Sequence, residues 1–115
     1  KIVKTKKIFT PYFGDKIHFV HLRNIIVRED GSFYESTHLE GSVPMRQVMQ
    51  ALVDEQTKRL AVGRKDVAIP LRPDHGHVLL YDKAKKNAFY PGYSLIGRAL
   101  GLAELSGLEQ GIRNF

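Results

Sequence analysis

Three side chains that can bind ions or transfer protons follow one apolar segment of the chain. Arg72, Asp74 and His75 come after the apolar residues of 67–71, where a turn rich in proline, glycine and charged residues closes the stretch. This pattern predicts a buried strand that delivers the three side chains at its carboxyl end, where α/β proteins place their chemistry. The two prolines of this stretch cannot donate hydrogen bonds to a sheet, so a central strand is not expected to continue past Arg72.

A second segment rich in β-forming residues, 16–24, also ends in polar side chains. Alternate side chains of a strand share a face, so His21 and Arg23 point the same way, and Asn24 follows at the carboxyl end. If the two strands are neighbours, His21 and Arg23 share an interior with Arg72 and Asp74. Imidazoles and a carboxylate suit a divalent first-row metal such as Mn²⁺ or Fe²⁺. Paired arginines suit a carboxylate substrate, which a guanidinium binds in a bidentate fork.

Each of these side chains also has an ordinary structural interpretation. A lone histidine such as His21 is as often a core residue bonded to the backbone as it is a metal ligand. Asp74 could instead cap a following helix, an equally common role for a carboxylate at such a position. Arg23 and Arg72 in one interior require an anion, which is either a protein carboxylate or a ligand.

The rest of the sequence predicts helices that can pack against two such strands. A helix is predicted after the start signals Ser42 and Pro44, and a final helix over residues 95–112 contains four glycines, which predicts close packing against a neighbour. The apolar stripe of the first of these helices is Met45, Val48, Met49, Leu52 and Val53, and its solvated side is Arg46, Gln47, Gln50, Asp54 and Glu55. Residues 24–43 form a long irregular connection. With the end of an amphipathic helix expected over residues 1–13, the order is helix, strand, helix, strand, helix, and the strands are parallel.

Composition narrows the class of protein further. The 115 residues contain no cysteine and carry a formal net charge of +6. No apolar run reaches the roughly 18 residues that a membrane span needs, so we expect a soluble, cytoplasmic protein with no membrane partner. The lysine clusters are not interleaved with aromatic residues, which favours a solvated surface over nucleic-acid binding. The chain begins at Lys1 rather than Met, so we expect it to be a piece of a longer polypeptide.

Four motifs, taken together and in order, resemble one family over nearly the whole chain. They are His18-Phe19-Val20-His21-Leu22-Arg23-Asn24, Gly31-Ser32-Phe33-Tyr34-Glu35 with His38-Leu39, Arg72-Pro73-Asp74-His75-Gly76-His77, and Pro91-Gly92-Tyr93-Ser94-Leu95-Ile96-Gly97-Arg98 with Gly101-Leu102-Ala103-Glu104-Leu105. This combination is similar to the carboxyl-terminal part of the metal-dependent bacterial mannonate dehydratases, which have a xylose-isomerase-like barrel.

The resemblance implies both a fold and an activity. Residues 1–115 would be the carboxyl-terminal part of a single catalytic domain, the last βα units of a (β/α)₈ TIM barrel. The implied reaction is the dehydration of D-mannonate to 2-keto-3-deoxy-D-gluconate in hexuronate breakdown, with Mn²⁺ or Fe²⁺ as cofactor. We expect the full-length protein to form a homo-oligomer, a dimer.

The resemblance also implies a role for each site residue. His21 and Asp74 would bind the metal, and His75 and Tyr93 would be the acid and the base, in an order that the sequence leaves open. Arg23, Arg72 and Asn24 would bind the sugar acid. The family's site also uses a His and a Cys from earlier strands, which this chain lacks, so we expect the 115 residues alone neither to fold stably nor to turn over substrate.

Two other functions remain as alternatives. A metal-dependent sugar isomerase on the same barrel would use the same metal and histidines, and a substrate panel separates water loss from aldose–ketose exchange. A small basic nucleic-acid-binding module would account for the net charge of +6. A salt-sensitive shift of labelled DNA or RNA would support that second alternative.

Overall fold

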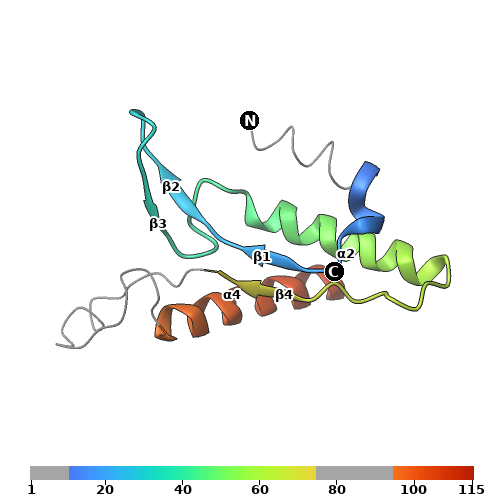
Figure 1. The fold of residues 1–115 in the computed structure, drawn as a ribbon. Coiled ribbons are helices and arrows are strands. Elements are labelled where there is room, and N and C mark those ends of the chain that lie inside the picture. Colours follow the sequence, from blue (N-terminus) through green and yellow to red (C-terminus); the bar gives the residue numbers. More distant parts are fainter. Residues whose placement is uncertain (1–10, 75–94) are drawn as a thin grey trace.

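Two helices cover one face of a two-stranded parallel sheet, and a β-hairpin projects beyond the end of the first strand (Figure 1). The structure is a computed structural model and describes residues 11–74 and 95–115. The elements, in order, are η1 (Gly14–Lys16), β1 (Val20–Leu22), β2 (Ile25–Val27), β3 (Phe33–Glu35), α2 (Met45–Ala61), β4 (Leu71–Pro73) and α4 (Leu95–Asn114). The α/β class and the parallel pairing predicted from the sequence are confirmed.

Strands β1 and β4 pair in a register that places His21 opposite Arg72. Backbone hydrogen bonds run from the Val20 N–H to the Pro70 carbonyl at 3.0 Å and from the Asp74 N–H to the Leu22 carbonyl at 2.8 Å. The expectation that the strand would not continue past Arg72 is wrong, because β4 includes Pro73. Residues of a parallel strand bond alternately to either side, so the nitrogen of Pro73 faces away from β1 and its missing N–H does not interrupt this ladder.

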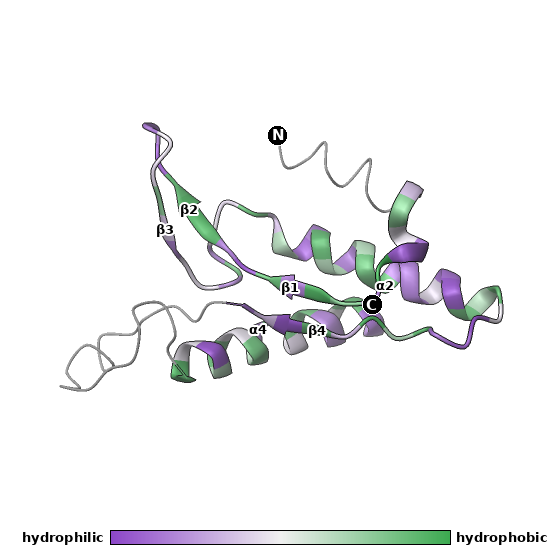
Figure 2. Ribbon diagram, in the orientation of Figure 1, coloured by the Kyte–Doolittle hydropathy of each residue, from purple (hydrophilic) through white to green (hydrophobic). Residues whose placement is uncertain are grey.

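The apolar core lies between this sheet and the two helices. Both helices carry alternating hydrophobic and hydrophilic bands (Figure 2). The buried apolar cluster consists of Leu22, Met45, Met49, Leu52, Ile69 and Leu105. The stripe predicted for α2 is confirmed, since Val53 is also buried and Val48 packs against the cluster. Neither helix of the described residues is long and apolar enough to cross a membrane.

The glycines of α4 differ in their surroundings. A Cβ at position 101 would meet atoms of the His38 ring at 2.6 Å, so the predicted close packing is confirmed there. A Cβ at Gly107 or Gly111 would meet nothing within 4 Å in the part of the chain that the structure describes. At those two positions the prediction is wrong, because α4 turns that side to open space.

The sequence predicted an irregular connection between β1 and α2, and this prediction is wrong. The connection holds the antiparallel pair β2–β3, in which Ile26 lies opposite Tyr34. The turn is closed by bonds from the Arg28 N–H to the Ser32 carbonyl at 2.8 Å and from the Gly31 N–H to the Arg28 carbonyl at 3.0 Å. The signal was present in the sequence: a β-branched run and an aromatic run flank a glycine-containing turn.

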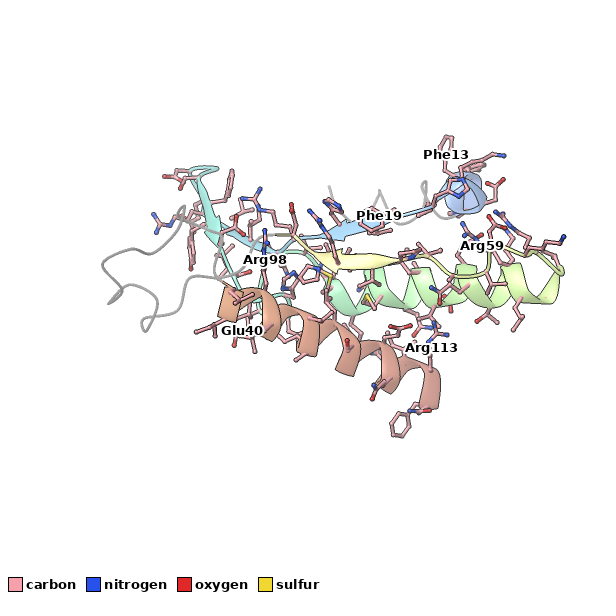
Figure 3. The ribbon with its side chains drawn as sticks, turned by 60° about the horizontal axis from the view of Figure 1, so that its bottom comes forward. Phe13, Phe19, Glu40, Arg59, Arg98 and Arg113 are labelled. Atoms are coloured by element: carbon pink, nitrogen blue, oxygen red, sulfur yellow. The ribbon has the colours of Figure 1, made fainter. Side chains whose placement is uncertain are left out.

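One helix residue expected on the solvated side of α2, Glu55, is instead buried in an ion pair. Its Oε1 accepts a bond from Arg59 Nε at 3.2 Å, and the two side chains are 2% and 1% exposed. Arg59 Nη2 also donates to the carbonyls of Gly14 at 2.7 Å and Ile17 at 2.6 Å. Arg59 therefore joins α2 to η1 and to the segment that enters β1 (Figure 3).

We expect Glu55→Ala in the intact protein to lower the free energy of unfolding by about 3 kcal/mol or more, because it leaves a buried guanidinium without its carboxylate. Glu109→Ala is the matched control, since Glu109 forms the same i,i+4 pair with Arg113 but is 34% exposed. Urea denaturation should give a change of at most about 1 kcal/mol for the control. Equal changes in the two variants would contradict the role of the buried pair.

Candidate functional site

The candidate site lies at the carboxyl ends of β1 and β4, on the sheet face that the helices leave open. His21 Nδ1 and Asp74 Oδ1 are 3.9 Å apart, and the two side chains are 43% and 30% exposed. The ring of Phe19 meets that of His21 edge-on, with centroids 4.8 Å apart. Figure 3 places Phe19 on the side of the sheet away from the helices. The alternation of a strand puts His21 and Phe19 on this face while Leu22 enters the core.

His21 and Asp74 can share one cation. Two ligands that each lie about 2.1 Å from a metal can be up to about 4.2 Å apart, so the observed 3.9 Å fits joint coordination. One imidazole and one carboxylate are also donors that Mn²⁺ and Fe²⁺ accept. Within residues 11–74 and 95–115, no group of three or more His, Cys, Asp or Glu side chains could hold a metal ion. These residues therefore provide part of a coordination sphere.

Arg23 has its anion within the protein. Its Nε donates to Glu35 Oε1 at 2.7 Å, and its Nη2 donates to the same oxygen. The guanidinium carbon also lies 5.7 Å from the centre of the Phe33 ring. Both partners belong to β3, so the hairpin holds Arg23 beside the end of β1. The sequence predicted that the anion near Arg23 and Arg72 is either a protein carboxylate or a ligand. For Arg23 the structure shows a protein carboxylate, that of Glu35.

The environment of Asn24 favours a structural role over the substrate-binding role predicted from the sequence. Its side chain is 1% exposed. Its Nδ2 donates to the carbonyls of His38 at 2.7 Å and Val43 at 3.0 Å. Its Oδ1 accepts from the N–H groups of Ile25 at 3.0 Å and Val43 at 2.9 Å. A side-chain amide can donate two hydrogen bonds and accept two, and the Asn24 amide makes all four. These bonds hold the loop after the hairpin against the end of β1.

A buried histidine that the sequence analysis did not assign lies next to the site. His38 is 2% exposed. Its Nε2 lies 2.9 Å from the carbonyl oxygen of Leu22, the residue after His21. Its backbone N–H donates to Glu104 Oε2 of α4 at 2.9 Å. Both residues belong to motifs that carried the family resemblance, but nothing in their spacing indicated that they would meet.

The remaining candidates divide into two groups. Arg72 is exposed at the register position opposite His21, so the structure brings it together with His21 and Asp74. His75 and Tyr93, predicted as acid and base, lie outside the described residues.

Comparison with known proteins gives one consistent result. The family model of D-mannonate dehydratase (UxuA) matches residues 4–115. The chain is 51% identical over 96 residues to a mannonate dehydratase of Saccharophagus degradans, covering 84% of this chain and 24% of that protein. It is 48% identical over 106 residues to one of Rhizobium meliloti, covering 90% of this chain and 26% of the relative. The chain thus spans about a quarter of the length of the curated relatives it matches.

A solved structure agrees with the sequence comparisons. The crystal structure of mannonate dehydratase from Streptococcus suis serotype2 superimposes with a TM-score of 0.66 at 33% identity. The similarity covers 91% of this chain and 27% of that one.

We expect Asn24→Ala in the intact protein to lower the free energy of unfolding by about 3 kcal/mol, because it leaves several buried backbone groups without partners. Gln50→Ala removes an amide whose bond to Asp54 is exposed, and it should change stability by at most about 0.5 kcal/mol. Urea denaturation measures both. An unchanged free energy of unfolding for Asn24→Ala together with a raised KM would contradict this structural role and restore the substrate-binding one.

Proposed function

The chain belongs to the D-mannonate dehydratase family, and we propose that the intact protein is a hydro-lyase that converts D-mannonate to 2-keto-3-deoxy-D-gluconate. Because the chain spans about a quarter of its relatives, the activity is proposed for the whole protein. The observation that carries the proposal is the approach of His21 Nδ1 to Asp74 Oδ1 at 3.9 Å, at the ends of two adjacent parallel strands.

We further propose that β1 and β4 are consecutive strands of a (β/α)₈ barrel. The succession β1, α2, β4, α4 contains two parallel strands, each followed by a helix, although the β2–β3 hairpin intervenes after β1. Two of eight strands are a quarter of a barrel, in keeping with the 24% of a relative that the chain covers. Both helices lie on one face of the sheet, as barrel helices do, and the opposite face carries the candidate site.

His21 and Asp74 are the residues of this chain that would hold a divalent cation, Mn²⁺ or Fe²⁺. When bound, the cation would stabilise the negative charge that develops on the substrate carboxylate as the C2 proton is removed. Asp74 directly follows β4, and His21 is the middle residue of β1. Other ligands would come from the part of the protein that precedes these residues.

Two arginines would bind the sugar acid. Arg72 is an exposed residue that lies opposite His21 in the sheet, two residues before Asp74. Arg23, oriented by its bonds to Glu35, would contact the substrate from the same edge of the sheet, with its charge balanced by that carboxylate. A guanidinium binds a carboxylate through two parallel hydrogen bonds, which would fix the C1 end of the substrate.

The chemistry requires one proton to leave and one to arrive. A base removes the proton at C2, the C3–O bond breaks as an acid protonates the departing hydroxyl, and the enol that remains tautomerises to the 2-keto acid. The family resemblance gives these two roles to His75 and Tyr93. The order of the two roles stays open.

The first test is a substrate panel on the intact protein with MnCl₂. We expect D-mannonate to lose water and form a 2-keto-3-deoxy acid, detected colorimetrically and by mass, and we expect EDTA to abolish this reaction. Interconversion of aldoses and ketoses without loss of water would identify the isomerase alternative and overturn the dehydratase proposal.

The second test concerns the metal pair. His21→Ala and Asp74→Asn should each weaken Mn²⁺ binding by at least about tenfold in isothermal titration, since each removes a proposed ligand. His18→Ala is the matched control, because His18 is exposed and precedes β1. Unchanged Mn²⁺ affinity in both site variants would remove His21 and Asp74 from the metal site.

A further inference from the structure

One backbone carbonyl beside the candidate site accepts hydrogen bonds from two different elements. The oxygen of Leu22 accepts the Asp74 N–H at 2.8 Å and lies 2.9 Å from His38 Nε2. A carbonyl oxygen can only accept, so Nε2 of His38 must carry the hydrogen that joins them. The Leu22 carbonyl therefore ties the end of β1 both to Asp74 and to the loop after the hairpin.

Within residues 11–74 and 95–115, the bond from the Asp74 N–H is the hydrogen bond between β1 and β4 that lies furthest towards their carboxyl ends. It lies one residue beyond the last register pair, Leu22 opposite Pro73, so it holds this end of β4 to β1. The position of the Leu22 carbonyl thus sets where the Asp74 backbone lies relative to His21. A change in that position alters the 3.9 Å separation between the His21 and Asp74 side chains.

Helix α4 holds His38 from the side opposite the Leu22 carbonyl. Its backbone N–H donates to Glu104 Oε2 at 2.9 Å, and its Nδ1 lies 4.0 Å from the same oxygen. Gly101, one turn earlier on α4, leaves the space that the ring occupies, because a Cβ there would lie 2.6 Å from Cε1 and Nδ1 of His38. His38 is 2% exposed, so its ring is enclosed by protein.

We propose that His38 is a positioning residue for the His21–Asp74 pair, held in place by Glu104 and by the space at Gly101. This inference rests on the proposed function, because it treats the pair as metal ligands. The His38 ring is hydrogen-bonded to the Leu22 carbonyl oxygen. It acts through the Leu22 carbonyl, as groups behind a metal site commonly do by fixing the orientation of the ligands.

The test measures Mn²⁺ affinity in the intact protein by isothermal titration, independently of turnover. His38→Leu removes the donor, and we expect the Kd for Mn²⁺ to rise about tenfold. His38→Gln keeps an N–H donor at a comparable distance from the backbone, so its Kd should stay within about threefold of wild type. Gly101→Ala should raise the Kd as His38→Leu does, because the new methyl group displaces the ring.

Two controls separate positioning from a general loss of stability. Gly107→Ala makes the same substitution in the same helix where a Cβ meets nothing within 4 Å, so its Kd should not change. Met49→Ala opens a cavity at a buried core residue, and it should lower stability without changing the Kd. If His38→Leu fails to fold, Gly101→Ala and His38→Gln still decide the question.

The outcomes distinguish this inference from the proposed function. An unchanged Kd in His38→Leu or in Gly101→Ala, or a rise as large in Met49→Ala, overturns the positioning role. A wild-type protein that binds Mn²⁺ through His21 and Asp74 but leaves D-mannonate intact overturns the dehydratase proposal alone. A wild-type protein that binds neither Mn²⁺ nor Fe²⁺ overturns both.

Discussion

The parallel pairing of β1 with β4 is the constraint on which the rest of the arrangement depends. Parallel strands need a crossover, and α2 provides it on one side of the sheet. The register then fixes which side chains meet: His21 lies opposite Arg72, and Asp74 follows one step beyond β4. Because α2 and α4 both pack on the face that contains Leu22 and Ile69, the polar side chains of both strands emerge on the other face.

Buried polar side chains make many of the connections between elements. Arg59, Asn24 and His38 are each almost fully buried, and each contacts backbone carbonyls of segments distant in the sequence. A buried polar group must find partners, so such residues specify one arrangement more narrowly than apolar contacts of the same size. The small apolar core supplies the driving force for burial, and these three side chains determine how the elements are placed relative to one another.

Periodicity and strand alternation predicted α2, α4 and the parallel pair, because those signals are local. They also placed His21, Arg72 and Asp74 together, since the carboxyl ends of parallel strands meet. They did not predict that the Glu55–Arg59 pair is buried, because a buried ion pair at i,i+4 and an exposed one have the same sequence pattern. Nor did they show that Asn24 anchors a loop, since its partners His38 and Val43 lie 14 and 19 residues away. The β2–β3 hairpin does have a local signal, the β-branched and aromatic runs on either side of a glycine-containing turn.

The nitrogen of Pro73 points away from β1, so the outer edge of β4 has no donor at that position. An extended segment from another molecule that approaches this edge finds an incomplete ladder. Exposed strand edges are templates for intermolecular β-pairing, and a proline on the edge discourages it. Pro73 therefore lowers the aggregation risk of β4 whenever that edge is uncovered, such as during synthesis of the polypeptide.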